Sequence, residues 1–301
     1  MINARRLRHA TLATNDVDRL VDYYESIIGL VQVGRAAGRV FLATESGQLA
    51  IVVESGEPRC RALALDISPN VSLEDARRAL SDNGISTTLL SDSAPGVANT
   101  LRFTDMEGRE VELISGSHSF DNRGAVSGIG PTKLGHVALY TRDPQSISKY
   151  YGDLLGFRVS DWIEDRFVFM RCGFEHHTMN FTTGPEVRVH HIAFELRDSA
   201  HMQRACDWLG RNRIQILWGP VRHGPGHNIA TYHRDPDGRV VELFYDLDRI
   251  IDEELGYFDP RPWHRDRPQR PKVWIGMPRD IWGVGPAPEL TEFARKTAHP
   301  V

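Results

Sequence analysis

The sequence predicts an α+β protein of two domains, each built from a pair of βαβββ modules, followed by an irregular C-terminal arm. Three observations predict this architecture. The 301 residues amount to about two ordinary domains. The composition, 41% hydrophobic and 25% charged, is that of a globular protein. An internal repeat relates the two halves of the chain, as a duplicated domain would.

The repeat is visible in three pairs of similar segments. His9 corresponds to His136, 127 residues later, and Asp105 corresponds to Asp235, 130 residues later. So small a drift over the length of a domain is typical of duplication and not of chance. The matching segments are 7–14 with 134–141, 22–30 with 149–157, and 105–113 with 235–243.

Each half divides again into a strand, a helix and three short strands. In the first half this pattern predicts helices near Asp16–Ile28 and Ser72–Asp82. In the second half, Asp143 is a good N-cap for a helix that ends near Gly156, and Asp198 begins another. The helix after Asp198 has one apolar face, formed by Met202, Ala205, Cys206 and Leu209.

From Asp259 onward the chain changes character. Eight of its 17 prolines lie between Pro260 and the C-terminus, which disfavours regular structure. Because this part also holds three tryptophans, we expect residues 259–301 to form an irregular arm packed on the second domain. The arm could cover a pocket as a lid or supply charge to an acidic substrate, but a surface arm or a subunit contact is equally open. The residues concerned are Trp263, Trp274, Trp282, Arg261, Arg265, Arg267, Arg270 and Arg279.

Charge and hydropathy argue against several classes of partner. A net charge of −4 without a basic block gives little support to binding of nucleic acid or anionic membranes. No apolar run approaches the ~20 residues of a spanning helix, and the N-terminus lacks an apolar export segment. The three cysteines are odd in number and far apart, so we expect reduced thiols and a cytoplasmic protein.

Three polar positions in the predicted strands of the second half are candidates for a site. Alternation along the strand turns His136 inward, whereas only one of His190 and His191 can face that side. Glu242 lies mid-strand among apolar residues, where a carboxylate without a partner is costly. Taken singly, a strand histidine is more often a core residue, and a strand glutamate more often faces solvent.

The repeat changes that balance. His136 and Glu242 correspond to His9 and Glu112, but the residue that corresponds to His191 is Ala62. One copy offers two histidines and a carboxylate, and the other lacks the middle group, as an active site and its decayed duplicate would. Two histidines and one carboxylate with open positions suit non-haem Fe(II) and O₂ chemistry, although manganese fits the same ligands. We therefore expect 1–120 to be a duplicated domain without a metal site and 130–258 to be the catalytic, metal-binding domain.

Three motifs of the second half resemble the type I extradiol ring-cleavage dioxygenases of the vicinal oxygen chelate superfamily, which include catechol 2,3-dioxygenases and dihydroxybiphenyl dioxygenases. These motifs are Leu134–Val137, Val189–Phe194 and the run Arg222–Leu243. The resemblance extends to about Asp248 and leaves out the arm. It implies cleavage of a catechol-type ring beside its two hydroxyls, with both atoms of O₂ entering a muconic semialdehyde-type product.

The same resemblance implies roles for individual residues. His136, His191 and Glu242 would bind Fe(II), with Mn(II) as the alternative, and His190 would face the opposite side. An acid/base histidine is expected in the strand before His191; His177 fits the spacing, and His176 stays open as the alternative. Two further residues match positions near the substrate oxygens, namely His223 and Tyr232. The other histidines match no catalytic position and are interpreted as strand relic, linker, helix surface, tail or unassigned: His9, His118, His201, His264, His299, His227 and His233.

Other functions remain open from the sequence alone. Glyoxalase-like relatives in the same superfamily bind metal through four protein ligands, but 178–183 contains no carboxylate to serve as the fourth. A zinc hydrolase could also use two histidines and a glutamate. The alternative outside the enzymes is a metal-free module that binds an aromatic compound. We expect a homo-oligomer acting on a small molecule, whose subunit number and catechol substituents the sequence leaves undetermined.

Overall fold

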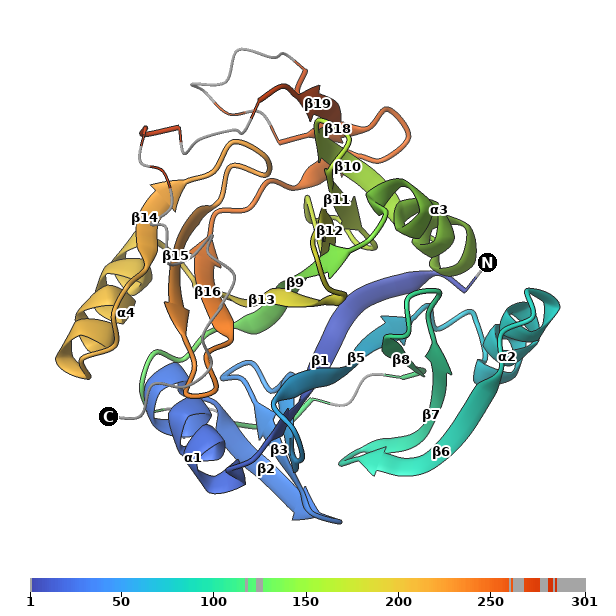
Figure 1. The fold of residues 1–301 in the computed structure, drawn as a ribbon, viewed down its shortest axis with the longest axis horizontal. Helices are drawn as coiled ribbons and strands as arrows, with labels where there is room; N and C mark the ends of the chain where they lie inside the picture. The colour runs from blue at the N-terminus through green and yellow to red at the C-terminus, as the bar shows by residue number, and fades with distance from the viewer. Residues whose placement is uncertain are drawn as a thin grey trace.

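The computed structural model describes residues 2–116, 119–122, 127–259, 261, 268–276, 281–283 and 285. Two large, curled β-sheets lie side by side in it, with the helices on their outer sides (Figure 1). None of the helices in these ranges combines the length and apolar character needed to cross a membrane. Several residues considered above fall outside the described ranges: His118, His264, His299, Trp263, Arg265, Arg267 and Arg279.

The first sheet has eight strands in the order β2-β3-β4-β1-β5-β8-β7-β6. Two βαβββ modules build it, and the antiparallel pair β1 and β5 joins them at the centre. The strands are β1 (Ala4–Thr14), β2 (Val31–Ala36), β3 (Arg39–Ala43), β4 (Leu49–Ser55), β5 (Arg59–Ile67), β6 (Thr87–Ala94), β7 (Val97–Thr104) and β8 (Glu110–Ile114).

The second sheet repeats this plan in the order β14-β15-β16-β13-β9-β12-β11-β10-β19. Its first eight strands come from two more modules, joined by antiparallel β9 and β13. The α+β architecture of four modules is thus confirmed. The strands are β9 (Lys133–Thr141), β10 (Arg158–Ile163), β11 (Phe167–Arg171), β12 (Met179–Thr183), β13 (Arg188–Glu195), β14 (Trp218–Arg222), β15 (Ile229–Arg234), β16 (Val240–Tyr245) and β19 (Lys272–Trp274), beside a separate pair, β17 (Ile250–Asp252) and β18 (Tyr257–Phe258).

Each α-helix begins next to the residue at which the sequence predicted its start, and that residue is its N-cap. The side chains of Asp16, Ser72, Asp143 and Asp198 each accept a hydrogen bond from a backbone N–H of the first turn, which satisfies a group that the helix leaves unpaired. Gly156 ends one helix at φ 76°, a left-handed conformation that glycine adopts without strain. The helices are α1 (Val17–Asp22), continued by the π-helical η1 (Tyr23–Ile28), α2 (Leu73–Asp82), α3 (Pro144–Leu155) and α4 (Ser199–Arg211).

One expectation about α4 is wrong. His201 does not lie on the helix surface: only 2% of it is exposed, and its Nε2 is 2.7 Å from the carbonyl oxygen of Ile129. The apolar face predicted from Met202, Ala205 and Leu209 is buried. His201 lies one position before Met202, so the buried face is wider than the apolar residues alone indicate, because an imidazole can be buried when its nitrogens find partners.

The two halves dock through copies of the same turn. In the first half Arg109 donates to the carbonyl oxygen of Tyr140 at 2.7 Å, and Asp105 accepts from the hydroxyl of Tyr151 at 3.1 Å. In the second half the corresponding turn, 235–239, makes the equivalent contacts with the first half. Arg239 donates to the carbonyl oxygen of Ala13, and Tyr24 Oη lies 3.4 Å from Asp235. The duplicated motifs found in the sequence therefore carry a reciprocal interface.

The arm is less irregular than its prolines predicted. Residues 272–274 form β19, which pairs in parallel with β10 and extends the second sheet (Figure 1). Proline cannot donate to a β-ladder, but Lys272–Trp274 contains none and leaves its amides available. The described part of the arm thus packs on the second domain as expected, but through a strand.

Docking of the halves has a consequence for acid stability. Nε2 of His233 lies 2.6 Å from the hydroxyl of Tyr23 across the interface, and burial lowers the pKa of His233 to about 3. Its unfolded-state pKa is about 6.5, so between these values the unfolded chain binds a proton that the folded chain does not. Stability therefore falls as pH drops through this window, by up to about 1.4 kcal/mol per pH unit from this residue.

We predict that His233→Asn makes the fall in unfolding free energy between about pH 6 and pH 4 shallower, because it removes one titrating group. Urea denaturation at a series of pH values measures this. Tyr23→Phe is the control, since it removes the hydrogen bond but keeps the buried imidazole and hence the slope. An unchanged slope in His233→Asn would contradict the prediction.

Candidate metal centre

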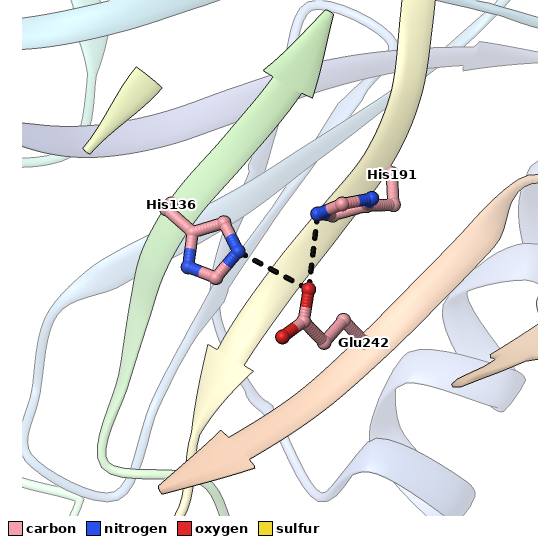
Figure 2. A group of neighbouring side chains, drawn as sticks. All are labelled: His136, His191 and Glu242. Atoms are coloured by element: carbon pink, nitrogen blue, oxygen red, sulfur yellow. Dashed lines mark hydrogen bonds and ion pairs between the residues drawn. The ribbon is translucent and has the colours of Figure 1, made fainter. Parts of the chain in front are cut away.

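Three neighbouring strands bring the predicted ligands together. His136 lies on β9, His191 on β13 and Glu242 on β16, and the side chains point toward one another (Figure 2). Strand register explains the meeting: Ala193 of β13 pairs with His136 on one side and with Glu242 on the other. His191 lies two residues before Ala193 and so faces the same side. The alternate residues Ile192 and Phe194 are buried in the hydrophobic core.

The three groups converge closely. One oxygen of Glu242 lies 3.1 Å from Nε2 of His136 and 3.0 Å from Nε2 of His191. The possible ligand atoms of all three residues lie within 4.8 Å of one another. Among the described buried polar atoms, Nε2 of His191 has no partner with hydrogen-bond geometry. Two imidazole nitrogens aimed at one carboxylate oxygen fit a divalent cation held between them.

The pKa shifts of the clustered residues also favour a bound cation. Burial by itself raises the pKa of Glu242, but the adjacent His136 and His191 outweigh it and hold this pKa well below its usual value. Burial also lowers the pKa of His136. An ionised carboxylate beside a neutral imidazole is the protonation state that a metal requires of its ligands. The cluster therefore suits a cation better than it suits a self-contained ion pair.

One buried residue at the centre has no counterpart among the predicted residues. Asn228 is 1% exposed and donates from Nδ2 to Oε1 of Glu242 at 3.1 Å. It occupies the carboxylate oxygen that the histidines leave, and so orients Glu242. The sequence carries no signal for this contact, because Asn228 lies in the loop before β15.

The adjacent histidines before β12 separate in space. His177 is 3% exposed, and its ring centroid lies 4.3 Å from that of His136, so it lies beside the cluster. His176 turns the other way, with Nε2 3.2 Å from a carboxylate oxygen of Asp161 on β10. Burial, together with the neighbouring His136 and His176, lowers the pKa of His177 well below its ordinary value.

A second pair of polar groups lies across the cluster from His177. Tyr232 pairs with Glu242 in the β15–β16 ladder, and its hydroxyl is 2.7 Å from Nε2 of His223. Trp218 stacks on the Tyr232 ring with centroids 5.3 Å apart. Burial, then the Glu242 charge, raises the pKa of Tyr232 well above its ordinary value. Sequence reasoning missed Trp218, whose position on the edge strand β14 offers no pattern.

The remaining histidines lie away from the converging atoms. Nδ1 of His190 is 2.7 Å from Nδ1 of His191, and its ring packs beside Tyr140. His227 is an ion-pair partner of Asp248. Neither histidine belongs to the group of converging ligand atoms.

In the first half, different residues occupy the positions that correspond to the cluster. Ala62 occupies the ladder position of His191, and His9 lies 3.5 Å from Glu112. Arg102 occupies the position of Tyr232 and contacts Glu112 at 2.6 Å. Burial opposes ionisation of Glu112, but His9 and Arg102 outweigh it and lower the pKa to about 2. A guanidinium thus neutralises this carboxylate, and no converging group of metal ligands is found in the described residues of this half.

Comparison with known proteins finds a match to a family profile in the second half. The sequence profile of the Glyoxalase/Bleomycin resistance protein/Dioxygenase superfamily matches residues 133–243. The match runs from the start of β9 into β16 and contains all three predicted ligands.

Relatives of the whole chain confirm the resemblance seen in the sequence. A manganese-dependent 2,3-dihydroxybiphenyl 1,2-dioxygenase from Geobacillus genomosp. 3 is 24% identical over 94% of this chain and 97% of its own. Further relatives are named as an iron-dependent extradiol dioxygenase and as dioxygenases of biphenyl-2,3-diol and 3-methylcatechol.

Solved structures of other proteins share the fold. A Mn(II)-bound glyoxalase from Novosphingobium aromaticivorans has a TM-score of 0.79 and 25% identity, and covers 100% of this chain and 96% of its own. Homoprotocatechuate 2,3-dioxygenase from Arthrobacter globiformis has a TM-score of 0.82 at 23% identity, with 97% and 92% covered. The chain therefore shares its overall fold with both of these solved structures.

We predict that the protein binds one divalent ion per chain and that His191→Ala weakens this binding by more than the 10- to 100-fold typical of outer contacts. His9→Ala in the duplicate is the matched control and should leave binding unchanged, because Arg102 already neutralises Glu112. Calorimetric titration with Mn(II), with elemental analysis of the product, measures both. Two ions per chain, or full binding by His191→Ala, would argue against this assignment.

Proposed function

We propose that the protein is an extradiol dioxygenase of the catechol 2,3-type. It would open the ring of a catechol-type diol beside its hydroxyls and add both atoms of O₂ to give a muconic semialdehyde-type product. The observation that carries the proposal is the convergence of two imidazoles and one carboxylate, with no fourth His, Cys, Asp or Glu in the group among the described residues. The names of the relatives support the same activity.

His136, His191 and Glu242 would hold Fe(II), or Mn(II) as in the manganese-dependent relative. When bound, such an ion would supply Lewis-acid activation of the diol. Asn228 would keep the carboxylate turned toward the histidines. In this part of the reaction the protein side chains would hold the ion in place and balance its charge.

His177 is the proposed acid/base. Because its pKa lies well below the ordinary value, the imidazole is neutral at pH 7 and can accept a proton from a substrate hydroxyl. The same proton can later be returned to an oxygen atom when the dioxygen bond breaks. The ring lies beside His136, with centroids 4.3 Å apart, and so next to the proposed metal ligands.

Tyr232 and His223 are proposed to bind and orient the substrate oxygens. The raised pKa keeps Tyr232 protonated, so its hydroxyl can act as a hydrogen-bond donor to negative charge. Contact with His223 and stacking on Trp218 hold the ring in one orientation. A preorganised donor stabilises developing charge without first having to reorient.

A glyoxalase activity is the main alternative, since one similar structure is a glyoxalase. Four-ligand sites of that kind draw a carboxylate from the last strand of each module, and β12 (Met179–Thr183) has none. The three-ligand set supports the oxygenase.

The decisive experiment is reconstitution of metal-free protein with Fe(II), and separately with Mn(II), without oxygen. Catechols with alkyl, aryl and carboxyl substituents are then added, and air is admitted. We expect a yellow product in which mass spectrometry finds both atoms of labelled dioxygen. His191→Ala is the control. Fully loaded protein that cleaves no catechol would rule the proposal out.

A second prediction concerns His177. We expect His177→Phe to retain the metal but lose roughly 10²–10⁴ in turnover, the usual size of an acid/base contribution. His233→Asn, which alters a buried histidine that contacts Tyr23 of the other half, is the control and should keep its turnover. Near-normal turnover in His177→Phe would move the acid/base role to His176 or elsewhere.

A further inference from the structure

His177 is the end of a chain of buried hydrogen bonds that begins in the C-terminal arm. Its Nδ1 lies 2.9 Å from Nδ1 of His176, and Nε2 of His176 lies 3.2 Å from Oδ2 of Asp161. Asp161 in turn contacts two residues of β19. The mechanism proposed above uses neither His176 nor Asp161, although both are almost fully buried, at 0% and 2% exposure.

The arm determines which hydrogen bonds the carboxylate of Asp161 can make. The backbone N–H of Lys272 donates to Oδ1 at 2.8 Å, and the indole N–H of Trp274 donates to Oδ2 at 2.8 Å. Both groups are donors only. They therefore require both oxygens of Asp161 to accept, which is the behaviour of an ionised carboxylate.

An accepting Asp161 determines the proton positions on the two histidines. Nε2 of His176 must carry the hydrogen that it donates to Oδ2. In a neutral imidazole the other nitrogen is then an acceptor, so Nδ1 of His176 receives a hydrogen bond from Nδ1–H of His177. That leaves Nε2 of His177 unprotonated.

The surroundings of His176 permit little other orientation. The rings of Phe169 and Phe258 pack against it, with centroids 5.7 and 5.3 Å away. Its backbone N–H donates to the carbonyl oxygen of Asp248 at 2.8 Å. A ring held by aromatic neighbours and by hydrogen bonds at both nitrogens cannot flip without losing them.

We propose that Asp161 and His176 are positioning residues that hold His177 in the tautomer with Nδ1 protonated and Nε2 free to accept a proton, and that β19 of the arm holds Asp161 for this purpose. The catalytic consequence rests on the proposed function, because only there does His177 take a proton from a substrate. The arrangement of protons does not depend on it. The arm then belongs to the reaction apparatus even though none of its described residues contacts the metal ligands.

The first test uses metal-free protein and needs no activity. A proton–nitrogen correlation spectrum of the histidine rings, assigned with His177→Phe and His176→Gln, reports which nitrogens carry hydrogen. We expect His177 protonated on Nδ1 only and His176 on Nε2 only. A His176 protonated on both nitrogens, or a His177 protonated on Nε2, would overturn the proposal.

The second test compares two carboxylates that both hold the arm. Asp161→Asn introduces a donor among groups that need acceptors, as in other histidine–aspartate pairs where this change leaves the wrong tautomer. Glu164→Gln is the matched control, because Glu164 accepts from the backbone of Gly276 but does not touch His176. We expect Asp161→Asn to lower kcat roughly 10- to 100-fold with KM and metal content retained, and Glu164→Gln to keep kcat.

The third test separates positioning from packing. Glutamine can accept a hydrogen bond from His177 and donate one to Asp161, whereas phenylalanine can do neither. We expect His176→Gln to recover at least about tenfold of the turnover lost in His176→Phe, within the range of such outer contacts. Equal loss in both variants, or loss of stability without loss of kcat in Asp161→Asn, would show a structural role only. If no catechol is cleaved, the proposed function fails, and the histidine spectrum still decides the tautomer.

Discussion

Glu242 lies 1% exposed in the middle of β16, and a carboxylate in that position is tolerated only because its surroundings provide for its charge. Desolvating a lone carboxylate costs several kcal/mol. Two imidazole nitrogens approach one of its oxygens and the amide of Asn228 occupies the other. Strand pairing in the second sheet produces this arrangement. The antiparallel β9–β13 pair and the parallel β13–β16 pair bring the three side chains to one face.

The first half shows how the same scaffold responds when the constraint is removed. The ladder positions are retained, but Ala62 and Arg102 replace the histidine and the tyrosine. A guanidinium then does for Glu112 what a metal ion would do for Glu242. The duplicate keeps its structural value, because its Asp105–Arg109 turn docks on the second half as the Asp235–Arg239 turn docks on the first.

Polar groups lie on two sides of the candidate metal centre, and the two sides differ in protonation. His177 stays neutral and able to accept a proton, whereas Tyr232 stays protonated and able to donate a hydrogen bond. Burial drives both shifts, since it disfavours the charged form of each group. An acceptor and a donor on opposite sides of one ligand cluster are what a reaction with proton transfer and developing oxygen charge requires. The C-terminal arm contributes by fixing the acceptor side through Asp161.

Much of this protein could be predicted from local pattern. The repeat, the helix caps at Asp16, Ser72, Asp143 and Asp198, and the inward side of β9 depend on spacing along the chain, so sequence reasoning reaches them. The duplicate, with Ala62 in place of His191, marked the positions of the three ligands as candidates, and the family resemblance selected His191 over His190. Contacts between distant segments were not reachable: Asn228 with Glu242, Trp218 with Tyr232, His201 with Ile129, and Trp274 with Asp161 join residues that no periodicity relates. They arise because buried polar groups take whichever partner the packed fold brings within hydrogen-bond distance, and that partner is known only once the strands have paired.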